Sequence, residues 1–195
     1  MNYKIILASG SPRRQQLLRE LRIPFTIKTI PVAEDYPADL PPDQVAQFLA
    51  EKKGKAYRNA LADDALVITA DTTVVVAGRL LNKPTDAVDA EAMLTTLSGR
   101  AHQVITGVCL TTAAASHSFA DTTTVYFRRL TPEEIRFYVE QEKPYDKAGG
   151  YAIQEWIGMV GIEKIEGSYF NVVGLPVEKL YRELQKFGSV LPPLS

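Results

Sequence analysis

This chain of 195 residues has very few of the side chains that build disulfides and zinc sites. Its single cysteine, Cys109, cannot form an internal disulfide, and its two histidines, His102 and His117, are too few and too isolated for a Cys/His zinc site. Cys109 lies in an apolar, strand-like run, which favours a place in the core over a role as a nucleophile. We therefore expect neither a disulfide-stabilised fold nor a Cys/His zinc centre.

The sequence also lacks a surplus of charge of either sign and any long hydrophobic run. Lys and Arg number 22 against 23 Asp and Glu, a formal net charge of −1, so no basic surplus is available to bind a nucleic-acid polymer. No stretch approaches the roughly 20 apolar residues of a membrane span, and the N-terminal run does not resemble a signal peptide. We expect a cytoplasmic protein without a membrane or nucleic-acid polymer as partner, and any phosphate binding must be local.

The periodicity of apolar residues indicates a mixture of helices and strands. With 46% hydrophobic and 23% charged residues, the chain is an ordinary globular sequence, long enough for a substantial core. Predicted helices cover 12–22, 43–61, 86–97, 131–141 and 176–187, and predicted strands cover 3–8, 24–30, 66–70, 72–76, 103–112, 119–129 and 160–165. Early alternation of helix and strand, followed by consecutive strands, predicts an α/β fold with a mixed sheet.

Glycines and polar residues mark the ends of several of these elements. Thr131-Pro132-Glu133-Glu134 is a complete capping box, and Gly99 is a C-terminal cap for the preceding helix. A hairpin is expected through residues 77–79. There is no Gly-x-x-x-x-Gly-Lys-Ser/Thr loop of the P-loop nucleotidases, and the single glycines Gly107 and Gly174 are interpreted as turn residues.

The most unusual stretch is Ser-Gly-Ser-Pro-Arg-Arg at residues 9–14, between the first predicted strand and helix. Ser11 is a natural N-cap, but Arg13 and Arg14 occupy a first turn that favours acidic residues, because a helix N-terminus is already positive. This short stretch then holds many hydrogen-bond donors: backbone N–H groups, the hydroxyls of Ser9 and Ser11 and two guanidinium groups. Such a concentration of donors and positive charge suits the binding of a polyphosphate. The alternative is a surface helix with two solvated arginines.

Two carboxylates stand at positions where ligands commonly bind in α/β folds. Asp71 follows the apolar strand 66–70, and the next residues continue as strand without a turn, which favours a site residue over a turn-former. Glu34 lies in the proline-punctuated loop 31–42, directly after a predicted strand. A loop rich in acidic residues is alternatively a solvated one.

Seven motifs follow one another along nearly the whole chain. They are SGSPRR at 9–14, ADT at 70–72, NKPTD at 82–86, SGRAH at 98–102, TGV at 106–108, DKAGGYAIQ at 146–154 and GSYFNVVGLP at 167–176. In this order they resemble the Maf family of nucleoside triphosphate pyrophosphatases. The resemblance implies a single Maf-like domain over 1–195 in which a curved mixed β-sheet with flanking helices forms two lobes around a cleft, similar to the inosine triphosphate pyrophosphatases. It also implies a homodimer.

The resemblance assigns candidate catalytic roles to three residues. Asp71 and Glu34 match positions that the family needs for activity and are the candidate ligands of a divalent cation, Mg²⁺ or Mn²⁺. Asp71 instead, or in addition, orients the attacking water as a general base. Lys83, held before Pro84, matches a family lysine that faces the phosphates.

Further candidates bind the substrate. They are Ser9, Ser11, Arg13, Arg14, Lys53, Thr72, Lys147 and Gln154. Lys53 matches a second phosphate-facing lysine, although Gly54 follows it where the family usually has alanine, and the alternative is one of three solvated lysines. The amide of Gln154 offers a donor and an acceptor together, as the O4/N3–H edge of thymine or uracil requires.

The motifs also indicate which nucleotide is the substrate. The paired arginines after Pro12, the run 146–149 and Gln154 resemble the subgroup that acts on dTTP and UTP. The subgroup acting on 7-methyl-GTP has an aromatic residue after the proline and a cysteine where Lys147 stands. We expect hydrolysis of dTTP, UTP or 5-modified pyrimidine nucleotides to the monophosphate and pyrophosphate, a house-cleaning reaction. The alternatives are a nucleotide-binding regulator of septum formation without catalysis and a phosphatase that removes the terminal phosphate.

Overall fold

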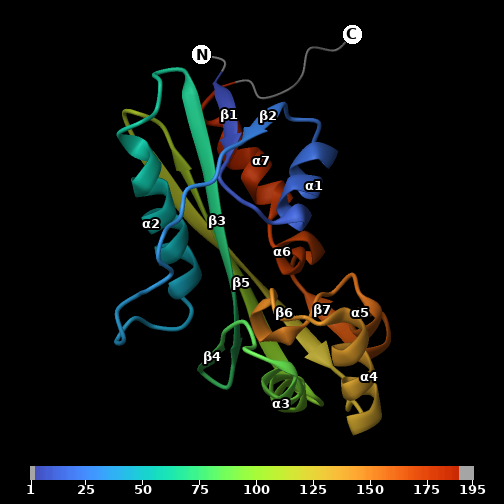
Figure 1. Cartoon of the computed structure of the whole chain (residues 1–195). Coiled ribbons are helices and arrows are strands. Elements are labelled where there is room, and N and C mark those ends of the chain that lie inside the picture. Colours follow the sequence, from blue (N-terminus) through green and yellow to red (C-terminus); the bar gives the residue numbers. More distant parts are fainter. Residues whose placement is uncertain (1–2, 189–195) are drawn as a thin grey trace. The chain divides into compact units, whose positions relative to one another are not determined.

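In the computed structural model, which describes residues 3–188, seven strands form one mixed β-sheet (Figure 1). The spatial order is β2-β1-β3-β5-β6-β7, and β4 pairs with β3. The strands are β1 (Lys4–Leu7), β2 (Phe25–Ile27), β3 (Ala65–Val76), β4 (Arg79–Leu81), β5 (Ala101–Thr111), β6 (Ser116–Phe127) and β7 (Ile162–Glu166). β1 runs parallel to β2 and β3, whereas the pairs β3–β4 and β6–β7 are antiparallel. The predicted α/β fold with a mixed sheet is confirmed.

The described residues group into two compact units. Unit 1 comprises residues 3–71, 106–121 and 174–188, and unit 2 comprises residues 72–105 and 122–173. The division falls within β3, between Asp71 and Thr72, and likewise within β5 and β6. Within residues 3–188, no helix has the length and apolar character needed to cross a membrane.

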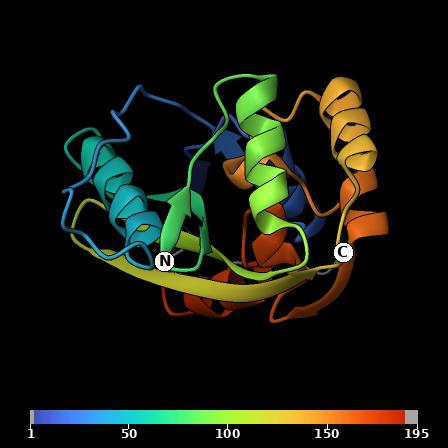
Figure 2. The same cartoon turned by 90° about the horizontal axis from the view of Figure 1, so that it is seen from below.

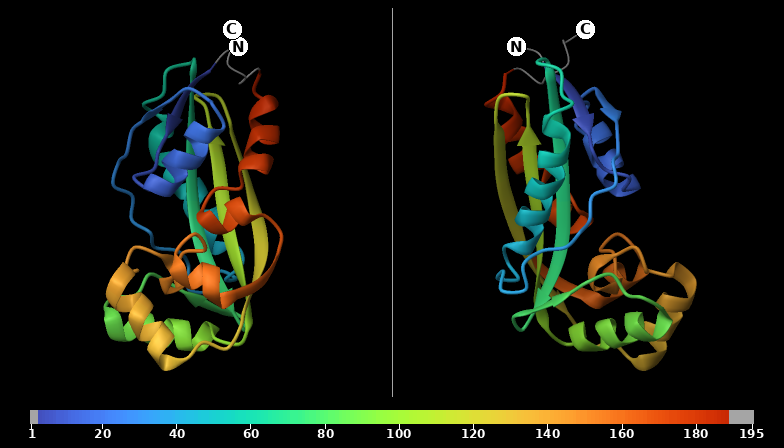
Figure 3. Two further views of the ribbon diagram at one scale, coloured as in Figure 1. Left: turned by 90° about the vertical axis from the view of Figure 1, so that its right-hand side faces the viewer. Right: turned by 60° about the vertical axis from the view of Figure 1, so that its left-hand side comes forward.

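Three helices belong to unit 1. They are α1 (Pro12–Glu20), α2 (Val45–Arg58) and α7 (Val177–Gln185). The predicted cap of α1 is confirmed, because the Ser11 hydroxyl accepts a hydrogen bond from the Arg14 N–H at 3.5 Å. Figure 3 shows α2 alongside the first half of β3. Cys109 is 2% exposed, as its apolar run predicted, and burial raises the pKa of its thiol.

α2 packs on the sheet at two glycines. A Cβ atom on Gly107, inside β5, would lie 2.4 Å from both the Ala46 carbonyl and the Gln47 Cα. The interpretation of Gly107 as a turn residue is therefore wrong, since its missing side chain lets the backbone of α2 approach β5. Gly54 of α2 fits the sheet in the same way, because its Cβ would lie 2.6 Å from the Thr111 hydroxyl.

Replacing Gly107 by Ala is expected to lower the free energy of unfolding by about 2 kcal/mol, a typical cost of overpacking. The atoms that the new methyl group meets belong to the backbone of α2, so a side-chain rotation cannot relieve the clash. Urea unfolding measures the effect. The matched control is Gly10→Ala, where the added Cβ meets no atom within 4 Å; equal stability of the two variants would contradict the close approach.

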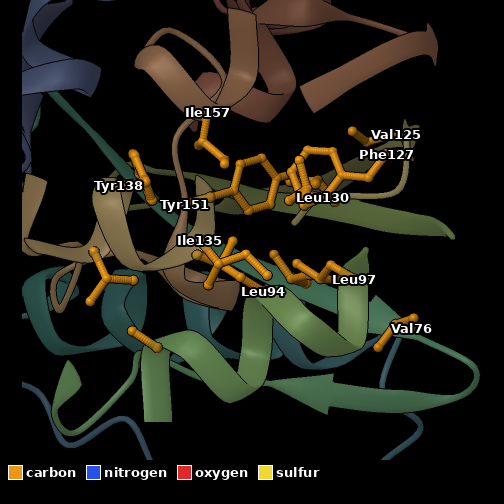
Figure 4. Packing of buried hydrophobic residues seen from close by; sticks show 14 residues of the cluster. Val76, Leu94, Leu97, Val125, Phe127, Leu130, Ile135, Tyr138, Tyr151 and Ile157 are labelled. Carbon is orange, nitrogen blue, oxygen red and sulfur yellow. The ribbon is translucent and has the colours of Figure 1, made fainter. Parts of the chain in front are cut away.

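Unit 2 is built from short helices around an apolar core. Its helices are α3 (Ala87–Leu97), α4 (Pro132–Glu142), α5 (Trp156–Gly161), α6 (Tyr169–Val173) and the 3₁₀ turn η1 (Ala148–Gly150). Figure 2 shows α3 and α4 side by side. The core brings Leu94 and Leu97 of α3 together with Tyr138 of α4, Tyr151 and Ile157 (Figure 4).

The predicted turn and cap signals of unit 2 are confirmed. Ala77 and Gly78, with φ values of 47° and 74°, join β3 to β4 in a two-residue turn whose positive φ angles match a type I′ hairpin. The Thr131 hydroxyl accepts from the Glu134 N–H, and the Glu134 carboxylate accepts from the Thr131 N–H. Arg128 also binds that carboxylate and lowers the pKa of Glu134 to about 2.

Three local predictions differ from the structure. The run 72–76 continues the strand 66–70 as expected, but Asp71 therefore lies inside β3 and not at the end of a strand. The predicted strand 160–165 starts later, at Ile162, because Ile157 and Gly161 are buried and form α5. Residues 167–174, where no helix was predicted, contain α6, whose buried Asn171 donates to the Val104 carbonyl and the Thr123 hydroxyl at 3.0 Å each.

Candidate functional site

The Ser9–Arg14 stretch forms a tight connection from β1 to α1 in unit 1. The Ser9 hydroxyl, on a residue only 6% exposed, accepts from the Ser11 N–H at 3.2 Å. The Gln15 amide donates to the Ser9 carbonyl at 3.2 Å. These bonds fix the backbone between strand and helix, and each serine keeps its own O–H as a donor.

Arg14 ties this stretch to β3. Its Nε donates to the Gly174 carbonyl at 2.8 Å and its Nη1 donates to the Ala70 carbonyl at 3.0 Å. Desolvation lowers the pKa of Arg14, and the neighbouring Asp71 and Glu34 carboxylates oppose that shift. Because Ala70 directly precedes Asp71, the guanidinium group of Arg14 fixes the strand at this carboxylate.

Lys53 of α2 holds the two candidate carboxylates together. Its Nζ lies 2.6 Å from Oδ1 of Asp71 and 2.8 Å from Oε1 of Glu34. The side chains of Lys53 and Asp71 are 17% and 13% exposed, whereas that of Glu34 is 48% exposed. Lys53 is therefore not a solvated surface lysine, and three residues far apart in the sequence meet at one place in unit 1.

The loop that carries Glu34 is anchored on α2. Lys52 binds the Asp35 carboxylate at 2.6 Å, and this hydrogen bond is the main cause that lowers the pKa of Asp35. The Tyr57 hydroxyl accepts from the Ile30 N–H at 2.9 Å and donates to the Lys28 carbonyl at 2.7 Å. The chain is thus held just before the loop, at Ile30, and again at Asp35 beside Glu34, so this part of the loop is not merely a solvated segment.

The carboxylates of Asp71 and Glu34 fit a divalent cation that arrives with its substrate. Among residues 3–188, no cluster of three or more His, Cys, Asp or Glu side chains could hold a metal ion by itself. Mg²⁺, however, commonly binds one or two carboxylates and completes its shell with waters and substrate phosphates. Two carboxylate oxygens within 2.8 Å of one Lys53 nitrogen provide such a pair.

Arg13 is half-buried in the first turn of α1 in unit 1, and the other four candidates belong to unit 2. Lys83 is exposed in the segment after β4, and this segment meets the Gly-rich loop because Gly149 N–H donates to the Asn82 carbonyl at 3.0 Å. Gly149 has a φ of 70°, and a Cβ there would lie 3.1 Å from the Val74 side chain. The structure thus brings the segment of Lys83 beside that of Lys147.

The three other unit 2 candidates differ in exposure. Thr72 is half-buried within β3, and Gln154 is exposed and precedes Glu155, the N-cap residue of α5. The Lys147 side chain is 9% exposed, and its Nζ lies 2.9 Å from Asp146 and 3.3 Å from Glu155. Glu155 could not be identified from the sequence, because its partners Tyr138 and Lys147 lie outside its own helix.

Comparisons with known proteins agree on the family and on the fold. The model of a family described as Maf-like protein matches residues 4–187. A protein of Porphyromonas gingivalis named dTTP/UTP pyrophosphatase is 52% identical over 190 residues, 96% of each chain. One of the same name from Phocaeicola vulgatus is 53% identical over 185 residues, 94% of this chain and 96% of that protein. Among solved structures, the Staphylococcus aureus Ham1 protein has a TM-score of 0.53 at 14% identity, covering 95% of this chain and all of that one, so the two share a fold.

Proposed function

This chain belongs to the Maf family, as its motifs indicated, and we propose that it hydrolyses dTTP and UTP to the nucleoside monophosphate and pyrophosphate. Relatives of that name match it over nearly its whole length. The observation that carries the proposal is the pairing of Lys53 with Asp71 and Glu34, on a strand that Arg14 holds. This cluster combines the carboxylates and cations that cleavage of a phosphoanhydride requires.

In the proposed reaction, Arg13 and the hydroxyls of Ser9 and Ser11 bind the phosphates, and Arg14 fixes the strand. A divalent cation, when bound by Asp71 and Glu34, supplies charge neutralisation at the phosphate oxygens. Water attacks the α-phosphorus and its proton passes to a carboxylate, for which Asp71 is the candidate. The bond to the bridging oxygen breaks and pyrophosphate leaves, while the ammonium groups of Lys53 and Lys83 offset its charge.

Base selection is assigned to residues of unit 2. The Gln154 amide can donate to O4 and accept from N3–H of thymine or uracil. We propose that Lys147 and Thr72 also bind the nucleotide substrate. By its family resemblance the enzyme is also expected to be a homodimer, which light scattering at several protein concentrations tests.

A panel of nucleoside triphosphates with Mg²⁺ or Mn²⁺ tests the proposal. We expect turnover of dTTP and UTP, pyrophosphate and not orthophosphate as the product, and loss of turnover on chelation of the metal. Release of orthophosphate would indicate a terminal phosphatase. Binding of dTTP by calorimetry without any hydrolysis would instead support a nucleotide-binding regulator.

Gly10 tests whether phosphate approaches the backbone of the 9–14 stretch. A Cβ at Gly10 meets no atom within 4 Å, so Gly10→Ala is expected to change the free energy of unfolding by less than about 0.5 kcal/mol. The methyl group would nevertheless hinder a phosphate at these N–H groups, and we expect KM for dTTP to rise roughly tenfold. Unchanged kinetics in this variant would place the phosphates elsewhere.

A further inference from the structure

A chain of hydrogen bonds in unit 2 links α4 to the loop before α5. The Tyr138 hydroxyl accepts from the Ala152 N–H at 3.2 Å and donates to Oε2 of Glu155. The other oxygen of Glu155, Oε1, lies 3.3 Å from Nζ of Lys147. Nζ also lies 2.9 Å from Oδ1 of Asp146. The chain thus connects both ends of the segment 147–155, which carries Gln154 as its exposed residue.

Tyr138 anchors this series of hydrogen bonds in the core of unit 2. Its side chain is fully buried in the apolar core of unit 2, near Ile135 and Tyr151 (Figure 4). Burial is the largest cause that raises the pKa of Tyr138, so its hydroxyl keeps its proton and acts as a donor. Because the Ala152 N–H occupies the acceptor side of this hydroxyl, the O–H bond is directed to Glu155.

Glu155 needs both of its oxygens for this arrangement. It is the N-cap residue of α5, but its side chain makes no capping hydrogen bond and is directed to Tyr138 and Lys147 instead. Its backbone carbonyl accepts from the N–H groups of Gly158 and Met159 and so begins the helix. Tyr138 contacts one carboxylate oxygen and Lys147 the other, whereas an amide carries at one of these two positions an NH2 group, which cannot accept a hydrogen bond.

We propose that Tyr138 and Glu155 are positioning residues that fix Lys147 and the Gln154 loop, and thereby set the preference for uracil and thymine over cytosine. The inference rests on the proposed function. A glutamine amide pairs with uracil in one orientation and with cytosine after it turns over, because the two bases present donor and acceptor in opposite order. Discrimination therefore requires that the loop be held in one arrangement, and an amide on a loosened loop loses it.

The ratio of kcat/KM for UTP to that for CTP tests this role, since it is independent of the amount of folded enzyme. For both Glu155→Gln and Tyr138→Phe we expect the ratio to fall roughly tenfold, the effect of one lost polar contact. Glu155→Asp keeps two acceptor oxygens and should retain more of the preference. Matched controls are Glu140→Gln, at an exposed position of α4, and Tyr145→Phe, neither of which is expected to change the ratio.

The outcomes separate this inference from the proposed function. A lower melting temperature with an unchanged UTP-to-CTP ratio in Glu155→Gln and Tyr138→Phe would show a purely structural role and overturn the inference. If the wild type binds UTP without hydrolysing it, the proposed function fails. The ratio of the dissociation constants for CTP and UTP, measured by calorimetry on the same variants, then decides whether the positioning role holds.

Discussion

Replacing Asp71 by Asn is expected to lower kcat for dTTP by about 10³-fold, within the range for loss of a general base. Asn keeps the shape of the side chain but cannot take a proton from water, and it binds a divalent cation more weakly than a carboxylate does. It also weakens the contact with Lys53, now 2.6 Å from Oδ1. Steady-state kinetics with pyrophosphate detection measures the loss.

The acidic loop offers a matched control for this substitution. Asp39 lies in the same loop as Glu34 and is exposed, and it takes no part in the contacts of Asp35 and Ile30 that hold the loop on α2. We expect Asp39→Asn to change kcat less than twofold, as surface substitutions outside a site usually do. At a Mg²⁺ concentration below saturation, an Asp71→Asn enzyme that kept more than a tenth of the wild-type kcat would contradict both roles assigned to Asp71.

The dependence on metal concentration separates those two roles. If Asp71 serves only as a metal ligand, Asp71→Asn should regain much of its activity when Mg²⁺ is raised to saturation, since Glu34 remains. If Asp71 accepts the proton of the attacking water, saturating Mg²⁺ leaves kcat low, because the general base is still absent. The same titration on Glu34→Gln gives the reference for loss of a ligand alone.

The sequence predicted those parts of the fold that depend on local chemistry. The capping box at residues 131–134, the Ala77-Gly78 turn and the cap at Ser11 each satisfy backbone groups within a few residues, so their signals are complete in the sequence. The α6 helix was missed because its support is tertiary. Asn171 bonds to Val104 and Thr123, which lie 67 and 48 residues away.

The same distinction applies to the candidate site. Positions after strands and the family resemblance selected Lys53, Asp71 and Glu34, and the structure brings these three residues together. The bonds of Arg14 to the main chain at Ala70 and Gly174 were not predicted, because an arginine that binds carbonyls has the same sequence signal as one that binds phosphate. Sequence patterns thus selected the candidate residues, while tertiary contacts determined what each of them touches.

The second large effect is expected in unit 2, at a histidine that the proposed reaction does not use. His102 of β5 is 2% exposed, and its Nε2 lies 2.7 Å from the Tyr151 hydroxyl. Its ring packs edge-on against Phe127 and Tyr151, with centroid distances of 5.2 and 5.4 Å. Among the described residues, Nδ1 has no hydrogen-bond partner. Burial lowers the pKa of His102 from 6.5 to about 4, because a charged ring would be desolvated here.

This lowered pKa makes the stability of the protein sensitive to mild acid. Between pH 6.5 and 4 the unfolded chain protonates His102 while the folded chain does not, so the free energy of unfolding falls as the pH falls. Over the whole window the loss amounts to about 3 kcal/mol. Carboxylates with lowered pKa values, such as Glu134 at about 2, lose their contribution only below the ordinary glutamate value of 4.5. Between pH 6.5 and 4.5, the fall in the free energy of unfolding therefore reflects protonation of histidine.

Urea unfolding of the wild type and of His102→Gln at several pH values between 7 and 4.5 tests this expectation. Gln does not titrate, and its amide can still bond to the Tyr151 hydroxyl, so the variant should lose less stability per pH unit whatever its stability at pH 7. At the steepest part of the curve, the wild type should lose up to about 1.4 kcal/mol more per pH unit than the variant. Parallel curves for the two proteins would mean that folded His102 takes up a proton as readily as the unfolded chain does. A ring so thoroughly removed from water, with one nitrogen bonded only to a neutral hydroxyl, gives no physical basis for that behaviour.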